Sequence, residues 1–353
     1  MRFFTCGQCG SRLYFENTVC ESCGTAAGFW SDTLALVSIG PEGPVFASAA
    51  VPGRFLRYCR NYEACACNWL VPSDGPAFCA ACALNRTIPD ITDPEKRLLW
   101  TKMQQAKARL VYALLRLGLS FDGTKGNALA FDILSEDGEM HGGGRPVLTG
   151  HENGLITLNL AEAHDAEREE RRLSMGELYR TLLGHFRHES GHYFWDQMVG
   201  GTPAIAEFRR LFGDERQDYA AALKAHYDAA PSTRWRQSYI SSYASAHPWE
   251  DWAETWAHYL HIVDTLDSAA ARRLSVVNGT KAPFLPDPYS APDAKSLIAA
   301  WLPLAEALNA LNRSMGLPDL YPFVLTDPIV QKLAFVHDLV AANRQAAPLQ
   351  QQA

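Results

Sequence analysis

His188-Glu189-Ser190-Gly191-His192 is an H-E-x-x-H pattern inside an apolar segment that continues to Trp195. Residues four apart lie on one face of a helix, so His188 and His192 are expected to present nitrogens to one zinc ion. Glu189 is then directed at a zinc-activated water, from which it takes a proton as general base. Upstream, Ser174-Met175-Gly176-Glu177 matches a capping box and predicts the start of this helix.

A second helix is predicted from His247 onward, with Pro248 at its first helical position. Its predicted buried stripe consists of Trp249, Trp252, Ala253, Trp256 and Leu260. Glu250 and Glu254 are four residues apart and share another face of the helix. Because a catalytic zinc site needs a third protein ligand and an open position for water, we predict Glu250 as that ligand. Glu254, one turn later, is predicted to hold the free N–H of a ligating histidine.

All nine cysteines lie within the first 82 residues, which marks a separate metal-binding region. In a chain without a secretory signal, clustered and odd-numbered cysteines favour metal over disulfides. The first predicted structural zinc site comprises Cys6, Cys9, Cys20 and Cys23. The second comprises Cys59, Cys67, Cys79 and Cys82. Cys65 is predicted to be a spare buried thiol, with replacement of a ligand in the second site as the alternative.

The remaining segments predict a mixed α+β body. Asp93-Pro94-Glu95 predicts the start of a helix that ends at Gly118. Residues 129–134 and 154–160 are predicted strands, and the glycine-rich residues 138–144 a turn or loop. The residues from Ala341 to the end predict a flexible tail.

Composition narrows the classes of protein that need consideration. The chain has 353 residues, of which 47% are hydrophobic and 20% charged, and its net charge is -7. These values predict a globular protein, and the absence of a long apolar run predicts a cytoplasmic protein without a membrane segment. Residues 1–90 contain six arginines, no lysine and seven carboxylates. We therefore expect no nucleic-acid partner, and instead a protein partner at the cysteine-rich region.

The two predicted helices resemble the active site of the gluzincin metallopeptidases, in which a downstream helical glutamate completes H-E-x-x-H. The pattern Tyr243-x6-Glu250-x-x-Ala253-Glu254 also resembles the zinc site of anthrax lethal factor. That likeness implies that Tyr243 assists the developing oxyanion. The gluzincin likeness further implies that an edge strand upstream of the zinc helix pairs with substrate, and residues 154–160 are the candidate.

A longer likeness extends over nearly the whole chain. The cysteine pairs, Cys67-Asn68-Trp69-Leu70, Asn85-Arg86-Thr87-Ile88-Pro89-Asp90 and the two zinc helices resemble a family of bacterial zinc-binding metallopeptidases with an N-terminal zinc ribbon. The likeness implies an α+β fold: a mainly helical, zincin-like catalytic domain with a small sheet, behind two zinc modules. The predicted domains are 1–90, 91–340 and a tail over 341–353.

The expected function is hydrolysis of peptide bonds in a peptide or protein substrate, with three zinc ions, one catalytic and two structural. Two alternatives stay open. In the first alternative, the chain is a zinc-ribbon scaffold that binds a partner through a non-hydrolytic H-E-x-x-H site. In the second, it is a zinc hydrolase of a non-peptide amide.

Overall fold

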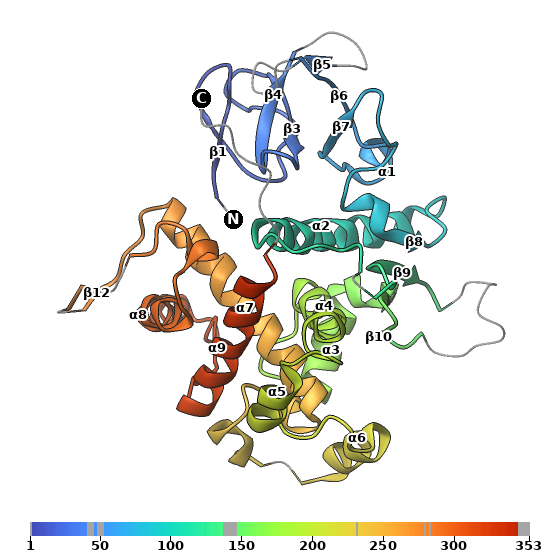
Figure 1. Cartoon of the computed structure of the whole chain (residues 1–353). Helices are drawn as coiled ribbons and strands as arrows, with labels where there is room; N and C mark the ends of the chain where they lie inside the picture. The colour runs from blue at the N-terminus through green and yellow to red at the C-terminus, as the bar shows by residue number, and fades with distance from the viewer. Residues whose placement is uncertain are drawn as a thin grey trace. The chain divides into compact units, whose positions relative to one another are not determined.

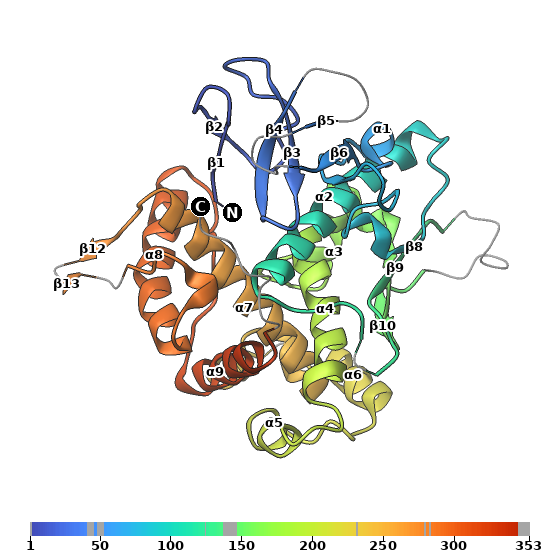
Figure 2. The ribbon, with the colours of Figure 1, turned by 45° about the horizontal axis from the view of Figure 1, so that its top comes forward.

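The contacts of the computed structural model group the chain into two compact units (Figures 1 and 2). One unit holds the residues up to Phe121 together with Ala128–Glu167, and the other holds Asp122–Asn127 and Arg168–Arg344. The structure describes residues 2–40, 46–47, 53–123, 125–136, 147–230, 232–278, 280–281 and 284–344.

The cysteine-rich part of the first unit is built from short antiparallel strands. They are β1 (Phe4–Thr5) with β2 (Arg12–Leu13), β3 (Ala26–Trp30) with β4 (Ala35–Ile39), and β5 (Phe46–Ala47), β6 (Phe55–Tyr58) and β7 (Leu70–Pro72) in one sheet. Helix α1 (Tyr62–Cys65) follows β6. Gly10 and Gly24 have φ angles of 74° and 73°, a left-handed conformation that glycine adopts at little cost where the chain turns after each cysteine pair.

The same unit contains a four-stranded sheet with the order β10-β11-β9-β8. Its strands are β8 (Asn85–Thr87), β9 (Ala130–Leu134), β10 (Gly150–Glu152) and β11 (Leu155–Asn159). Strands β8, β9 and β11 are parallel, and β10 is antiparallel to β11. Both strands predicted from residues 129–134 and 154–160 are confirmed. The prediction that residues 154–160 form an edge strand is wrong, because β10 covers that side of β11.

Ile156 and Leu158 on one face of β11 are fully buried, whereas Leu155 and Thr157 on the other face are partly exposed. Alternation carries no information about strand order, so it could not reveal that the three-residue strand β10 lies outside β11. The predicted loop over 138–144 lies outside the described residues.

Helix α2 (Pro94–Arg116) begins where predicted, because the Asp93 side chain accepts hydrogen bonds from the backbone N–H groups of the first turn. Tyr112 of α2 packs against Phe15 at 5.1 Å between ring centroids, and Phe29 packs on Trp69 at 4.6 Å. This aromatic core joins α2 to the cysteine-rich strands within the first unit. The two compact units are defined by contacts within the chain and do not test the predicted domain limits. The limits 1–90 and 91–340 therefore stay predictions.

The second unit is mostly helical. Its helices are α4 (Leu182–Met198), α5 (Ile205–Phe212), α6 (Tyr219–Asp228), α7 (Pro248–Ala271), α8 (Ala294–Ser314) and α9 (Asp327–Ala342), with a short hairpin of β12 (Val277–Asn278) and β13 (Thr280–Lys281). Helix α3 (Asp165–Ser174) joins the two units along the chain. Helix α9 includes Ala341 and Ala342. Residues 345–353 lie outside the described residues, so the flexible tail stays a prediction.

Helix α4 starts seven residues later than the capping-box pattern predicted. Ser174 ends α3, and its hydroxyl donates to the Arg171 carbonyl. Glu177 pairs with Arg180 instead of closing a capping box. The true N-cap is Thr181, whose side chain accepts a hydrogen bond from the Gly184 N–H.

Helices α4 and α7 pack closely side by side (Figures 1 and 2). Trp252 and Trp256 of α7 are fully buried, as predicted. Their indole N–H groups donate to the Gly191 carbonyl at 2.8 Å and to the Ser190 hydroxyl at 3.1 Å. Ser190 and Gly191, which lie between Glu189 and His192, therefore hydrogen-bond α4 to α7. Across the described residues, no helix has the length and apolarity needed to span a bilayer.

Candidate metal centres

His188 and His192 lie one turn apart on α4 and face Glu250 in the first turn of α7. Oε2 of Glu250 is 3.0 Å from Nε2 of His188 and 3.5 Å from Nε2 of His192. The two imidazole rings are 5.0 Å apart and nearly perpendicular. One ligand atom from each residue lies within 4.8 Å of the other two, so the three could hold a metal ion. Two imidazole nitrogens and one carboxylate oxygen are a donor set that suits zinc.

Glu254 orients His188 from the opposite side of its ring. Nδ1 of His188 donates to Oε1 of Glu254 at 2.7 Å, which leaves Nε2 directed at Glu250. Burial raises the pKa of Glu254, but the hydrogen bond and charge of His188 outweigh it and lower this pKa to about 2. Burial likewise opposes protonation of His188, yet its hydrogen bonds to Glu250 and Glu254 raise its pKa well above the usual value. A carboxylate in this position is the usual support for a ligating histidine.

Glu189 lies between the two histidines in the sequence and is 8% exposed. Its Oε2 is buried and has no hydrogen-bond partner among the described residues. A buried carboxylate oxygen without a partner is costly for folding, so its retention here points to a chemical role. This geometry suits a proton acceptor beside the metal ligands.

Tyr243 lies in a 3₁₀ turn (Tyr243–Ser245) just before α7. Its ring centroid is 5.9 Å from that of His188. Burial and the negative charge of Glu250 raise the pKa of Tyr243 far above its usual range, so its phenol stays protonated and can donate a hydrogen bond.

Tyr219, the first residue of α6, was missed by the sequence analysis. Its hydroxyl donates to Oε1 of Glu250 at 2.6 Å. Burial and the charge of Glu250 also raise the pKa of Tyr219 far above its usual range. Tyr219 precedes Glu250 by 31 residues across an irregular connection, and no spacing rule joins two such positions.

The other histidines near the site have structural partners. His258 hydrogen-bonds to the Tyr321 hydroxyl at 2.9 Å, and Nδ1 of His261 lies 3.1 Å from the Arg187 guanidinium. Arg187 in turn pairs with the buried Asp264 of α7. At the start of α7, the buried Lys332 of α9 pairs with Asp251 at 2.6 Å. These contacts hold the helices that carry the ligands.

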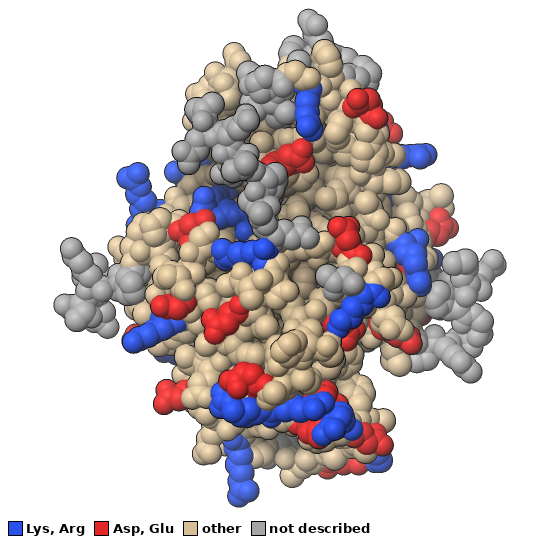
Figure 3. Space-filling model, viewed as in Figure 1, with Lys and Arg blue, Asp and Glu red and all other residues tan. Residues whose placement is uncertain are grey.

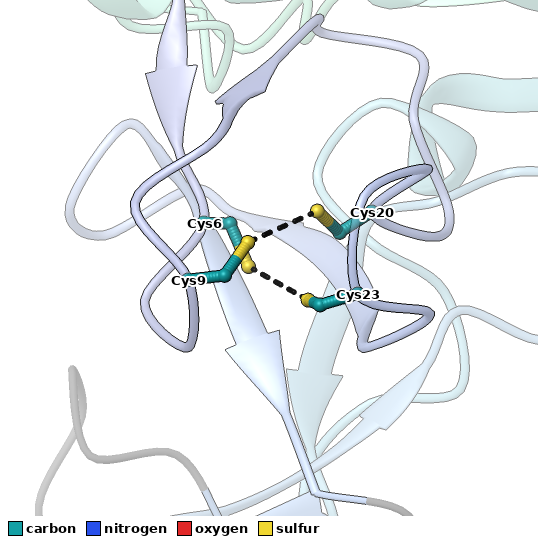
Figure 4. A group of neighbouring side chains, drawn as sticks. All are labelled: Cys6, Cys9, Cys20 and Cys23. Atoms are coloured by element: carbon teal, nitrogen blue, oxygen red, sulfur yellow. Dashed lines mark hydrogen bonds between the residues drawn. The ribbon is translucent and has the colours of Figure 1, made fainter.

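The first cysteine group forms a compact cluster at two turns (Figure 4). The four side chains point toward one another, with sulfur distances of 3.7 Å between Cys6 and Cys23 and 3.6 Å between Cys9 and Cys20. A tetrahedron with zinc–sulfur bonds of about 2.3 Å has sulfur atoms about 3.8 Å apart. The cluster therefore has the size of a zinc site.

The second cysteine group has the same dimensions. Sγ of Cys67 lies 3.8 Å from that of Cys79 and 3.7 Å from that of Cys82, and Cys59 completes the group. Cys65 stays outside it, buried, with its thiol donating to the Asn61 carbonyl. The structure thus brings together the four cysteines that the sequence analysis selected.

Comparison with known proteins identifies relatives of both regions. Residues 96–339 match the family model described as "putative zinc-binding metallo-peptidase", and residues 3–93 match a zinc-ribbon domain. Uncharacterized proteins of Mycobacterium bovis and Mycobacterium tuberculosis are 42% identical to this chain over 346 residues, which cover 96% of this chain and 95% of each relative. No solved structure matches. The chain therefore belongs to the family of zinc-binding metallopeptidases that this model describes, with a zinc-ribbon domain at its N-terminal end.

Proposed function

We propose that this protein is a zinc-dependent metallopeptidase of the zincin-like, gluzincin type that hydrolyses peptide bonds. One observation carries the proposal: two imidazole nitrogens and one carboxylate oxygen converge between α4 and α7, next to Glu189, whose buried Oε2 has no hydrogen-bond partner among the described residues. His188, His192 and Glu250 would hold the zinc ion. A purely structural site would need neither Glu189 nor a phenol donor such as Tyr243.

Each side chain has a separate task in the proposed reaction. A zinc ion, when bound, lowers the pKa of a water molecule and polarises a peptide carbonyl. Glu189 accepts the proton of the attacking water and returns it to the leaving amine. Tyr243 donates a hydrogen bond to the carbonyl oxygen as negative charge develops there, a contribution of about 2–4 kcal/mol. Glu254 keeps His188 in the orientation that metal binding requires.

The two cysteine groups would each hold one structural zinc ion, because all four thiols in each group converge and leave no position for water. We propose that this region binds a protein rather than a nucleic acid. Residues 1–90 contain six arginines and seven carboxylates, and each of the two zinc–thiolate centres would add further negative charge. Such a region repels the phosphates of a nucleic acid. On the face drawn in Figure 3, basic and acidic side chains are interspersed, which is compatible with such a partner.

The test combines a peptide-library cleavage assay with measurement of bound zinc. Replacement of Glu189 by Gln removes the proton acceptor and keeps the shape, so Glu189→Gln should retain zinc and lose about 10²–10⁴-fold of the activity. Glu207→Gln is the matched control, because Glu207 is exposed on α5 and pairs with Arg210. Full activity in Glu189→Gln would refute the mechanism. A wild-type protein that binds the third zinc and cleaves no peptide would favour the scaffold alternative.

A further inference from the structure

Tyr219 contacts the first turn of α7 through both its hydroxyl group and its aromatic ring. Its hydroxyl donates to Oε1 of Glu250 at 2.6 Å. Its ring lies edge-on to His247 at 5.2 Å and to Trp249 at 5.9 Å between centroids. His247 is the N-cap of α7 and Trp249 directly precedes Glu250, so the ring contacts hold the phenol in place together with the carboxylate.

The Tyr219–Glu250 hydrogen bond gives the two carboxylate oxygens of Glu250 different partners. Oε1 accepts from Tyr219, whereas Oε2 lies 3.0 Å from His188 and 3.5 Å from His192. Glu250 is only 1% exposed, so water does not compete for Oε1 as it would at the surface. A donor at one oxygen fixes the rotation of the carboxylate and keeps the other oxygen directed at the histidines.

Helix α6 is largely exposed to solvent. None of its ten residues is buried, and its cap is the Asp218 side chain, which accepts from the Ala221 N–H at 3.0 Å. A second α6 side chain, His226, lies edge-on to Tyr243 at 6.2 Å. A short exposed helix with so few buried contacts belongs to the part of a protein that opens at low free-energy cost. The Tyr219–Glu250 hydrogen bond is therefore one of the contacts that dock α6, together with the ring contacts of Tyr219 and His226.

We propose that Tyr219 is a positioning residue that fixes the Glu250 carboxylate for metal binding and thereby couples occupancy of the metal centre to the docking of α6. The inference rests on the proposed metal centre but not on its catalytic activity. Coupling of this kind is reciprocal: if docked α6 favours zinc, zinc must favour docked α6 to the same extent.

The first experiment measures zinc affinity in the full-length chain by competition with a chelator. The variant His192→Ala lacks one ligand of the third site and retains both cysteine groups. Its zinc binding therefore measures the contribution of the two structural sites alone. Tyr219→Phe removes one hydroxyl and should weaken zinc binding at the third site by about 10–100-fold, as loss of a ligand's supporting partner does. Tyr227→Phe is the matched control on the same helix, because Tyr227 is 61% exposed, and it should bind zinc as the wild type does.

The second experiment measures hydrogen exchange of the α6 amides with and without zinc. In the wild type, zinc should slow exchange across Tyr219–Asp228, and in Tyr219→Phe this zinc-dependent protection should disappear. A role in packing alone would change exchange equally in both metal states. Zinc affinity equal to that of the wild type in Tyr219→Phe, or a zinc-dependent protection that survives, would overturn the inference.

Neither measurement depends on hydrolysis, so the outcomes separate the two proposals. A wild-type protein that binds no third zinc would refute the metal centre and the role of Tyr219 together. A third zinc that binds equally well to wild type and Tyr219→Phe would refute the role of Tyr219 alone.

Discussion

Replacement of Gly191 by alanine tests whether the close packing of α4 on α7 sets the geometry of the metal ligands. Gly191 lies inside H-E-x-x-H, directly against α7. A Cβ atom at Gly191 would lie 2.9 Å from the Cα atom of Ala253 and 3.1 Å from Cδ1 of Trp256. Ordinary contact begins near 3.4 Å, so α4 and α7 would have to separate by about 0.5 Å. Neither a backbone atom nor a fully buried indole can yield without moving its helix.

The same displacement has unequal effects on stability and on metal binding. Overpacking costs about 1–3 kcal/mol, whereas alanine gains about 1 kcal/mol over glycine in helix propensity. The net loss in the free energy of unfolding is therefore about 0–2 kcal/mol. Metal–ligand distances, in contrast, tolerate only about 0.2 Å, and the ligands come from both helices. We expect Gly191→Ala to fold and to bind the third zinc at least about 10-fold more weakly.

Chelator competition measures the zinc affinity, and thermal unfolding of the metal-free chain measures the stability. Gly150→Ala is the control, because a Cβ atom at Gly150 would meet no atom within 4 Å. If Gly191→Ala binds zinc within about twofold of the wild type, the spacing of α4 and α7 does not control the site, and this reasoning is wrong.

Three further predictions address the remaining ligands and roles. Native mass spectrometry should find three zinc ions in the fully loaded chain, and two or fewer would remove one of the proposed centres. Glu250→Ala should release the zinc held by the histidines, whereas Glu254→Ala should weaken it about 10–100-fold in chelator competition; the opposite order would exchange their assignments. Tyr243→Phe should lower kcat more than it raises KM, with zinc affinity and Tm nearly unchanged, because the lost hydrogen bond acts in the transition state. A variant that loses stability and keeps its kcat would make Tyr243 a packing residue.

The sequence predicts those parts of the sites that depend on short separations. His188 and His192 are brought together by one turn of helix, and each cysteine pair by one tight turn. The separation of Glu250 and Glu254 predicts that both face the same neighbour, and both contact His188. In these cases the local backbone conformation alone places the side chains.

Features that depend on which of several partners a side chain or strand selects escaped the sequence analysis. The pattern from Ser174 to Glu177 satisfies the capping-box rule, yet Glu177 gains more from Arg180 than from closing the box. Strand β11 is internal because β10 pairs with it, and strand order is not encoded in alternation. Tyr219 reaches Glu250 only after α6 has folded back toward α7. Arg180 and β10 are partners close by in the sequence, whereas the contact of Tyr219 with Glu250 spans 31 residues.

The acidic side chains between α4 and α7 explain why the proposed metal centre favours a cation. Glu250 is 1% exposed and Glu254 pairs with the same histidine, so two carboxylates need a compensating positive charge. Glu250 and Glu254 raise the pKa of His188, because a proton on its ring balances one of their two negative charges. Zinc requires the same imidazole nitrogen in its deprotonated form, so metal and proton compete for one position. A proton offsets one of the two negative charges, whereas a zinc ion carries two positive charges and would offset both.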